Sequence, residues 1–509
     1  MSSRCSVASI LAESARRFPT KDALVLGPVR VPYAAVWDQA LRYGAVLQAR
    51  GVKPGDRVAL LIPNIPQFAF AYYGALAVGA SVVPVHSLLK HDEMEYILRD
   101  CGAKVMVGAA PLLGEGAVAA KAAGVDLLGV LDGCPEGIDR IEALAAAATP
   151  LATYLPRNPQ DEAVVLYTSG TTGKPKGAML SHDNILWNVN TIAFDTIELK
   201  STDVLLGALP LFHSFGQTVV LNGGFRVGAT IALVPRFEPA SALELLVSEK
   251  VTILAGVPTM FIALLEAAKT NPDRPPLRMA VSGGAAIPVA TIEKVKEVFD
   301  IDIYEGYGLS ETSPVATFNQ ERYGRKPGTV GCAIWGIDVE IADADVADRI
   351  VFMPQGERGE IVIRGHNIFN GYLNKPEATA EAIIDGWFRS GDVGIKDEDG
   401  FISIVDRTKD MIIRGGFNVY PREVEEVIIR FPGVKQVAVI GIPHDVHGEE
   451  IVAVIVAEEG AVTAVELIEW TKENIGSYKY PRHVEFVAEM PLGPSGKVLK
   501  RVLLEQFKK

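Results

Sequence analysis

The chain has 509 residues, of which 49% are hydrophobic and 22% charged, a composition close to that of globular proteins and far from disordered or collagen-like chains. At roughly 100–200 residues per domain, this length predicts two to four domains and excludes a short binding module. Lys and Arg number 49 against 62 Asp and Glu, giving a net charge of −13. This charge disfavours non-specific contact with nucleic acid or an anionic membrane and favours small-molecule partners.

The N-terminal segment, residues 1–19, has an amphipathic pattern and predicts a surface helix rather than a signal peptide. The most apolar stretch, residues 68–85, is interrupted by glycine and proline, so we expect a buried helix followed by a strand and no integral membrane span. The four cysteines show no CxxC spacing, which argues against a disulfide framework or a metal site and predicts a cytoplasmic protein. Peripheral membrane contact stays open, as does the choice between a monomer and a homodimer.

Short β-branched runs alternate with helical patterns along the N-terminal part of the chain. These runs cover residues 57–62, 104–107, 163–167, 229–234 and 251–254. Strands buried on both faces and separated by helices predict an α/β fold with layered, mostly parallel sheets. Glycine-bounded runs at 361–363 and 400–405 have little helix between them and predict a small β-rich region at the end of this large domain.

A charged connector at residues 406–409 separates this part from a tail of different character. We therefore expect two domains, residues 1–408 and residues 409–509. The tail pattern predicts hairpin, helix, two strands, helix and strand, which is a small α+β unit able to move on the connector. Its first helix should begin at Pro421, because proline suits a first turn and an i, i+3, i+4, i+7 apolar face follows it.

A segment rich in glycine and threonine follows the strand expected at 163–167. It reads Thr168, Ser169, Gly170, Thr171, Thr172, Gly173, Lys174, Pro175, Lys176 and Gly177. Small residues let backbone N–H groups approach an anion, hydroxyls add donors, and Lys174 and Lys176 supply charge. The segment therefore predicts a polyphosphate-binding loop. It differs from a Walker A loop, which needs Gly at 168 and Ser or Thr at 175.

Five segments in order resemble the signatures of the adenylate-forming superfamily, which comprises acyl-CoA synthetases, adenylation domains of peptide synthetases and luciferases. They are residues 167–177, 307–312, 390–392, 406–409 with 415–416, and 494–497. The similarity extends along essentially the whole chain. It implies ATP, Mg²⁺ and CoA as cofactors and co-substrates, and a mobile C-terminal domain.

The resemblance also assigns roles in the first half-reaction, in which a carboxylate attacks the α-phosphate of ATP to give an acyl adenylate and pyrophosphate. Charge that develops on phosphoryl oxygens must be neutralised. The implied Mg²⁺ ligand is Glu311, since a carboxylate suits a hard cation. Lys497 would reach from the small domain to the substrate carboxylate and the α-phosphate.

The nucleotide site implied by the resemblance has two sides. Tyr307 would stack on adenine, whereas Asp392, assisted by Arg407, would accept hydrogen bonds from the ribose hydroxyls. The remaining ATP- or AMP-binding residues, in addition to the loop, are Gly283, Gly284, Ala285, Glu305, Gly306, Gly308 and Ser310.

In the second half-reaction the CoA thiol attacks the adenylate. The resemblance implies a hinge at Lys409 and a tunnel for pantetheine beside Gly415 and Gly416. His213 would lie near the acyl pocket and this tunnel as a further catalytic residue. By looser correspondence, the acyl pocket comprises Phe212, His213, Asn222, Val257, Gly283 and Pro314.

We therefore expect an ATP-dependent acid–CoA ligase for a medium- or long-chain fatty acid, since the pocket candidates are mostly neutral. An aryl or arylpropenoic acid is the alternative substrate. An acyl-AMP ligase feeding a carrier protein shares every adenylation residue, but the sequence shows neither a carrier domain nor an insertion before the hinge that resembles those ligases. A catalytically inactive sensor would require loss of Lys497 or Glu311, and both are present.

Overall fold

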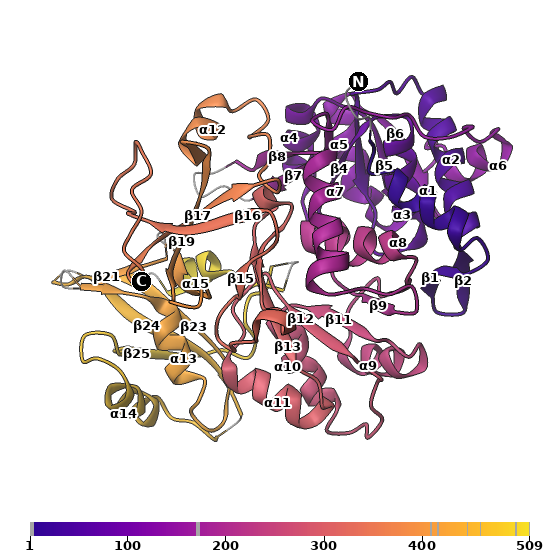
Figure 1. Ribbon diagram of the computed structural model, residues 1–509. Helices are drawn as coiled ribbons and strands as arrows, with labels where there is room; N and C mark the ends of the chain where they lie inside the picture. Colours follow the sequence, from indigo (N-terminus) through magenta and orange to yellow (C-terminus); the bar gives the residue numbers. More distant parts are fainter. Residues whose placement is uncertain are drawn as a thin grey trace.

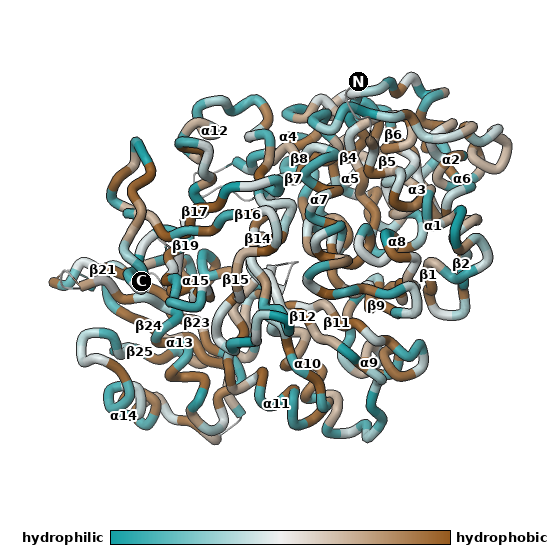
Figure 2. The backbone as a smooth tube through the Cα atoms, in the orientation of Figure 1, coloured by the Kyte–Doolittle hydropathy of each residue, from teal (hydrophilic) through white to brown (hydrophobic). Residues whose placement is uncertain are grey.

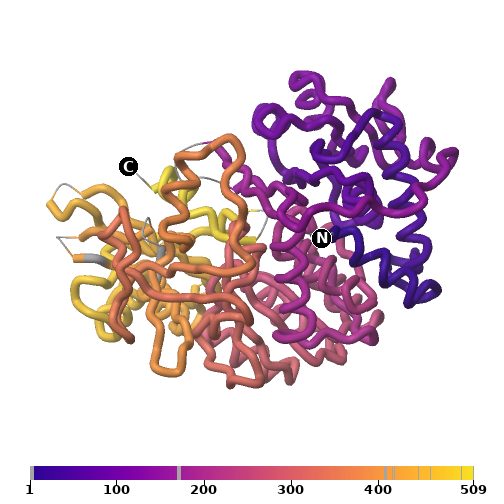
Figure 3. The backbone as a smooth tube through the Cα atoms, turned by 45° about the horizontal axis from the view of Figure 1, so that its top comes forward, coloured from indigo at the N-terminus to yellow at the C-terminus, as the bar shows by residue number. Residues whose placement is uncertain are grey.

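Two mostly parallel sheets form the larger part of the molecule, and a β-rich unit and a C-terminal α+β unit follow them in the chain (Figure 1). The computed structural model describes residues 5–168, 174–407, 410–414, 417–444, 446–458, 460–493 and 496–507. Figures 1 and 3 agree in placing the first sheet and the C-terminal sheet at opposite ends of the molecule. The predicted fold class is confirmed.

The first sheet has six strands and is parallel except at one edge. In spatial order they are β6 (Asp126–Val130), β5 (Ala103–Ala109), β3 (Arg57–Leu61), β4 (Ser81–Pro84), β7 (Glu162–Thr168) and β8 (Lys176–Ser181). Alternate residues of β3 pack into two different apolar clusters, Val58 and Leu60 into one and Ala59 and Leu61 into the other. Both faces are therefore covered, which explains the continuous apolar runs in the sequence.

Helices on either side of this sheet complete the two clusters. They are α1 (Ser9–Arg17), α2 (Tyr33–Ala49), α3 (Pro66–Ala77), α4 (His91–Cys101), α5 (Leu113–Ala123) and α6 (Ile141–Ala147). The apolar stretch 68–85 forms α3 and β4, both buried throughout, as predicted. Within the described ranges, no helix combines the length and the apolar character needed to cross a membrane. Figure 2 shows hydrophobic residues gathered in the interior and hydrophilic residues on outer loops.

The second sheet has nine strands. In spatial order they are β15 (Cys332–Ala333), β14 (Val315–Phe318), β13 (Ile303–Gly308), β12 (Met279–Ser282), β11 (Ile253–Gly256), β9 (Val204–Gly207), β10 (Thr230–Leu233), β1 (Asp22–Leu26) and β2 (Val29–Pro32). Because β11, β12 and β13 run parallel, the segments after them, which begin at 257, 283 and 309, meet at one edge. Such an edge is the usual position of a ligand site in α/β proteins.

Further helical segments belong to this part of the chain. They are α7 (His182–Thr191), η2 (Ile192–Thr196), η3 (Gly216–Asn222), α8 (Gly223–Val227), α9 (Pro239–Ser248), α10 (Pro258–Ala267), α11 (Val289–Phe299), η4 (Ser310–Thr312) and η5 (Glu321–Tyr323); η1 (Ala110–Leu112) precedes α5. Helix α7 begins with a capping box, in which the Ser181 hydroxyl accepts from the Asn184 N–H and the Asn184 side chain accepts from the Ser181 N–H.

The β-rich unit is an antiparallel sheet. Its strands are β16 (Ile337–Ala342), β17 (Arg358–Gly365), β18 (Ile383–Ile384), β19 (Trp387–Lys396) and β20 (Ile402–Arg407), with α12 (Pro376–Ala382) before β18. The register of β19 and β20 sets Asp392 opposite Arg407. The pairing of β19 with β20 therefore places the third signature segment, residues 390–392, beside residues 406–407 of the fourth.

The C-terminal unit follows the predicted order of hairpin, helix, two strands, helix and strand, with one more helix at the end. Its elements are β21 (Ile412–Arg414), β22 (Phe417–Val419), α13 (Pro421–Ile428), β23 (Val434–His444), β24 (Gly448–Ala457), α14 (Ala464–Asn474), β25 (His483–Phe486) and α15 (Lys500–Phe507). Helix α13 begins at Pro421 and buries Val424 and Ile428 against β23 and β24. The 493–499 loop between β25 and α15 reaches the edge of the second sheet.

Candidate active site

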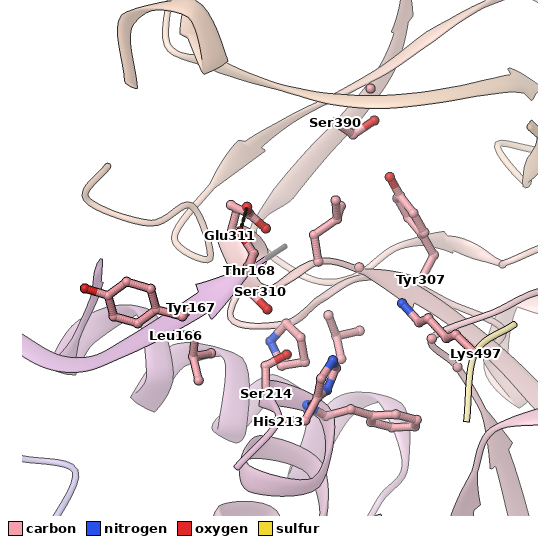
Figure 4. A pocket seen from close by; sticks show the side chains of 18 of the residues that line it. Leu166, Tyr167, Thr168, His213, Ser214, Tyr307, Ser310, Glu311, Ser390 and Lys497 are labelled. Carbon is pink, nitrogen blue, oxygen red and sulfur yellow. Dashed lines mark hydrogen bonds between the residues drawn. The ribbon is translucent and has the colours of Figure 1, made fainter. Parts of the chain in front are cut away.

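A cavity of about 1140 Å³ lies where the ends of β7, β12 and β13 meet the 493–499 loop. Its lining includes many of the predicted site residues, which come from widely separated parts of the chain. These are Thr168, Lys176, Phe212, His213, Gly283, Gly284, Gly306, Tyr307, Gly308, Ser310, Glu311, Pro314 and Lys497. Figure 4 shows how the labelled side chains lie around this space.

Glu311 is held at one wall of the cavity by two hydroxyl groups. It lies in the short helix η4 and is only 7% exposed. Its Oε1 accepts a hydrogen bond from the Tyr372 hydroxyl at 2.9 Å and one from Thr168 Oγ1 at 3.5 Å. Burial, and then the Glu311 charge, raises the pKa of Tyr372, so this phenol stays a donor. The carboxylate and the Thr168 hydroxyl form an oxygen donor set of the kind Mg²⁺ prefers.

Of the two predicted loop lysines, Lys176 lies at this wall, whereas Lys174 is absent from the described lining. The Lys176 Nζ lies 4.9 Å from the centroid of the Tyr372 ring, beside Glu311's phenol donor. The Lys174 Nζ lies 4.9 Å from the Tyr96 ring centroid, and the Tyr96 hydroxyl donates to the Pro175 carbonyl at 3.2 Å. Helix α4, which carries Tyr96, therefore holds the end of the loop that enters β8.

Replacing Lys174 with alanine should raise the KM for ATP by roughly tenfold, because one charge-assisted contact with a phosphate would be lost. The fold should be unaffected, since Lys174 is exposed. ATP saturation curves for adenylate formation measure the effect, with Lys294→Ala on exposed helix α11 as the control. ATP kinetics equal to those of the unaltered enzyme would remove Lys174 from the phosphate site.

Tyr307 and Asp392 are brought together on the opposite wall. The Tyr307 hydroxyl donates to Asp392 Oδ2 at 2.6 Å, and Asp392 is 3% exposed. The Ser390 hydroxyl accepts from the Asp392 N–H at 3.0 Å and donates to the Ile361 carbonyl at 2.7 Å. This chain of hydrogen bonds fixes the Tyr307 ring as a flat wall suited to a purine. The described cavity lining includes Ser390 and Gly391 but not Asp392 itself.

Gly284 and Gly496 permit the close approach of the 493–499 loop. A methyl group on Gly284, whose φ is +80°, would stand 3.5 Å from Cε of Lys497. Gly496 has φ +75°, and a Cβ there would lie 2.7 Å from Val257 Cγ2. The Thr259 hydroxyl, at the start of α10, donates to the Gly496 carbonyl at 3.3 Å. These contacts direct Lys497 into the cavity, as Figure 4 shows.

His213 is neutral in this environment. Its Nδ1 accepts a hydrogen bond from the Phe215 N–H at 3.2 Å, so the ring proton resides on Nε2. Burial, together with the charge of Lys497, lowers the pKa of His213 to about 3. A neutral imidazole that donates through Nε2 suits an acceptor oxygen and cannot remove a proton from a thiol at that nitrogen.

Three predicted site residues, two of the acyl pocket and one of the nucleotide site, are absent from the described cavity lining. Asn222 is fully buried, where its Oδ1 accepts from the Tyr73 hydroxyl at 2.6 Å and its Nδ2 donates to the Tyr72 hydroxyl at 3.2 Å. It fixes α3 to the second sheet's helices and does not line the described cavity. Val257 contacts Gly496 and supports the 493–499 loop instead of the acyl pocket. Ala285 is exposed beyond Gly284 and is also absent from the described lining.

Glu305 also differs from its predicted role in the nucleotide site. Its Oε2 accepts from the Gly328 N–H at 2.9 Å, and the side chain is absent from the described lining. Burial raises the pKa of Glu305 to about 7. The hydrogen bond from the Gly328 N–H, and not the alternation of side chains along β13, accounts for this placement, because Glu305 and Tyr307 are two residues apart and alternation alone would give them the same face. Glu305 therefore supports the turn at Gly328.

Known proteins resemble this chain over nearly its whole length. The family model described as AMP-binding enzyme matches residues 11–373, and the model described as AMP-binding enzyme C-terminal domain matches residues 423–497. The chain belongs to the AMP-binding enzyme family. A long-chain-fatty-acid–CoA ligase of Bacillus subtilis is 36% identical, covering 98% of this chain and 94% of that protein. A feruloyl-CoA synthase of Amycolatopsis is 38% identical and covers 97% of each chain.

Solved structures give the same assignment for this AMP-binding enzyme. ATP-bound MatB from Rhodopseudomonas palustris has a TM-score of 0.89 at 33% identity, covering 99% of both chains. The anthranilate CoA ligase AuaEII in complex with anthranoyl-AMP has a TM-score of 0.93 at 26% identity, covering 99% of this chain and 97% of that one. The predicted membership of the adenylate-forming superfamily, and the prediction of an AMP-forming acid–thiol ligase, are confirmed.

Some predicted residues of this AMP-binding enzyme lie outside the described residues. They are Ser169, Gly170, Thr171, Thr172 and Gly173 of the loop, Lys409 of the hinge, and Gly415 and Gly416 of the tunnel. For Arg407 only the backbone is described. Their roles stay predictions. Sequence reasoning missed Tyr372, which lies 61 residues from Glu311 along the chain and belongs to no signature.

Proposed function

We propose that this AMP-binding enzyme is an ATP-dependent acid–CoA ligase. A carboxylic acid and ATP give acyl-AMP and pyrophosphate, and CoA then gives acyl-CoA and AMP. The observation that carries the proposal is the convergence on one cavity of a lysine, a buried carboxylate and a tyrosine wall. The charges of these residues and the shape of the cavity match the three groups that adenylation brings together, which are the substrate carboxylate, the triphosphate and the adenine.

The residues of the cavity have different roles in the first step, the formation of the acyl adenylate. Lys497 would approach the α-phosphate and the attacking carboxylate, where its charge stabilises the transition state more than the ground state. Tyr307, held by Asp392, would orient the adenine. Glu311 and Thr168 would hold Mg²⁺, which when bound neutralises charge on the phosphates. Lys174 and Lys176 would add positive charge at the same phosphates.

We propose that residues 1–408 and 409–509 are separate domains and that the pose described here is the adenylating one, since Lys497 faces the cavity. Contacts across the boundary support this pose. Arg358 pairs with Glu423 at 3.0 Å and lies over the Tyr420 ring at 4.3 Å, and Arg422 donates to the Ile404 carbonyl at 2.6 Å. For the second step, rotation about Lys409 would replace the Lys497 face with the Gly415–Gly416 face.

The acid that we propose is a medium- or long-chain fatty acid, with an arylpropenoic acid as the second candidate. Apolar side chains form one part of the lining, which supports an apolar acid: Ile192, Ile197, Val219, Val315 and Phe318. Two arginines that could otherwise pair with a second carboxylate are engaged elsewhere. Arg226 donates to Asn190 at 2.8 Å, and Arg322 pairs with Asp195 at 2.9 Å. The named activities of the Bacillus subtilis and Amycolatopsis relatives support the two candidates.

A panel of acids scored by pyrophosphate release tests the proposed function. Alkanoates of increasing length should improve kcat/KM by up to about 0.8 kcal/mol per buried CH₂, roughly fourfold per carbon, until the pocket is full. Benzoate serves as the short aryl comparison and 4-hydroxycinnamate as the arylpropenoic one. If aryl acids exceed every alkanoate, the second candidate replaces the first.

The proposed function also includes CoA as the thiol that accepts the acyl group and a cytoplasmic location for the enzyme. AMP release that depends on CoA would separate a CoA ligase from an enzyme that passes its adenylate to a carrier protein. A cytoplasmic location is supported by the four cysteines, which are free thiols suited to a reducing compartment. Sedimentation analysis would distinguish a monomer from a homodimer.

A further inference from the structure

Two serines of the cavity lining have hydroxyls that are buried in the wall and have no hydrogen-bond partner among the described residues. Ser214 and Ser282 are each 1% exposed, and both line the cavity. Neither Oγ has a partner within the described ranges. Figure 4 shows the Ser214 side chain beside His213, directed toward the interior of the cavity. Ser214 follows His213 in the chain, and Ser282 ends β12 immediately before Gly283.

Such hydroxyls are unusual, because a buried polar group without a partner destabilises a fold by roughly 1–3 kcal/mol. Several other buried hydroxyls follow the rule, although the Tyr43 hydroxyl in the core also lacks a partner within the described ranges. Ser81 donates to the Glu162 carbonyl at 2.9 Å, and Ser313 donates to the Asn367 carbonyl at 2.8 Å. Even Thr196, which also lines the cavity, donates to the Ile192 carbonyl at 3.1 Å. A substrate that forms hydrogen bonds with these two hydroxyls would explain why they have no partner in the protein.

A third polar atom adds to this set. His86 lines the cavity, and its ring centroid lies 4.5 Å from that of Phe212. Its Nδ1 accepts from the Leu88 N–H at 3.0 Å, so Nε2 carries the proton, and this buried Nε2 also lacks a partner within the described ranges. The cavity wall therefore offers neutral donors, and a neutral donor suits an uncharged acceptor oxygen.

We propose that the acid activated by this enzyme carries an oxygen atom besides its carboxylate, as a hydroxyl, ether or carbonyl group, and that the Ser214 hydroxyl binds it. The inference rests on the proposed ligase function and narrows the class of acid. A plain hydrocarbon chain would leave Ser214 and Ser282 without partners in the complex. A site built to hydrogen-bond a substrate oxygen rejects the analogue that lacks it.

Matched pairs of acids test the proposal, each pair differing only by CH₂ against O or CH₃ against OH. The probes are dodecanoate against its oxa-analogues of the same chain length, in which oxygen replaces one CH₂ at successive positions, and 4-methylcinnamate against 4-hydroxycinnamate. In pyrophosphate exchange, the unaltered enzyme should prefer the oxygen-bearing member of at least one pair about tenfold in kcat/KM, the effect of roughly one hydrogen bond. Ser214→Ala should reduce that preference to about twofold or less.

Ser81→Ala is the matched control, since it removes a buried, bonded hydroxyl outside the cavity and should keep the preference. Thermal melting checks that each variant is folded, and Ser282→Ala supplies the test if Ser214→Ala does not fold. An equal loss for every acid in Ser214→Ala would mean that the hydroxyl binds the carboxylate, which overturns the proposal. So would a preference for the hydrocarbon member of every pair. Absence of exchange with any acid would overturn the ligase function itself.

Discussion

Lys497→Ala should lower the rate of adenylate formation by roughly 10²–10³ while thioester formation from a supplied acyl adenylate survives. A unit charge pair at 4 Å is worth about 4 kcal/mol at an effective dielectric of ~20, and about 1 kcal/mol in water. Losing about 3–4 kcal/mol from the transition state gives that fall in rate. The 493–499 loop holds Lys497 inside the cavity, which makes the larger value appropriate.

Both half-reactions must be measured on the same preparation. Pyrophosphate exchange reports the first, and acyl-CoA formation from synthetic acyl adenylate reports the second. Lys472→Ala is the control, because Lys472 lies on exposed α14 and pairs only with Glu469 at 3.4 Å among the contacts described. Equal losses in both steps for Lys497→Ala would indicate one rigid active site and would contradict the proposed domain alternation.

The reciprocal variant is Lys409→Pro. Proline fixes φ at the proposed hinge, so exchange should persist while transfer to CoA fails, provided the adenylating pose is the one retained. Gly416→Leu should give the same pattern by filling the proposed tunnel. Both positions lie outside the described residues, so these variants test the predicted roles directly.

Local sequence was sufficient to predict the elements that carry the site. The run at 163–167 became β7, residues 162–168, because its apolar side chains face two covered sides of one sheet. Pro421 began α13 because the ring is tolerated in a first turn. Tyr307 and Glu311 reached the cavity because β13 ends at the edge where the segments after the parallel strands meet, and Lys497 reached it through the contacts of Gly496 with Val257 and Thr259.

Contacts between side chains far apart in the chain could not be predicted from the sequence. Nothing near Tyr372 indicates that its hydroxyl donates to Glu311, since the two lie on different units of the fold. Asn222 resembled a pocket residue by position, yet the tyrosines of α3 hold it in the core. Glu305 adjoined a signature, but its carboxylate accepts a hydrogen bond from the Gly328 N–H, a residue outside that signature. The unpartnered state of Ser214 depends on every neighbour of its hydroxyl, and no single segment determines it.

Glu311→Gln should lower adenylate formation by roughly 10²–10³ and raise the Mg²⁺ concentration needed for half-maximal rate. Gln keeps the size of the side chain and an acceptor oxygen for the Tyr372 hydroxyl, so the change removes a charge with little change in packing. Losing one carboxylate charge beside a divalent cation at an effective dielectric of ~20 removes about 4 kcal/mol or more of attraction. The variant therefore separates the charge of Glu311 from its structural contacts.

Mg²⁺ titrations of pyrophosphate exchange at saturating ATP and acid measure this effect, and Tyr372→Phe is the matched control. Removing the Tyr372 hydroxyl deletes the 2.9 Å hydrogen bond but leaves the Glu311 charge, so the Mg²⁺ requirement should shift much less than in Glu311→Gln. Position 311 is 7% exposed and lines the cavity, so Tyr372→Phe keeps at this position the charge that Glu311→Gln removes. If Tyr372→Phe shifts the Mg²⁺ dependence as far as Glu311→Gln, the carboxylate acts by positioning Tyr372, and the assignment of Glu311 as the metal ligand is wrong.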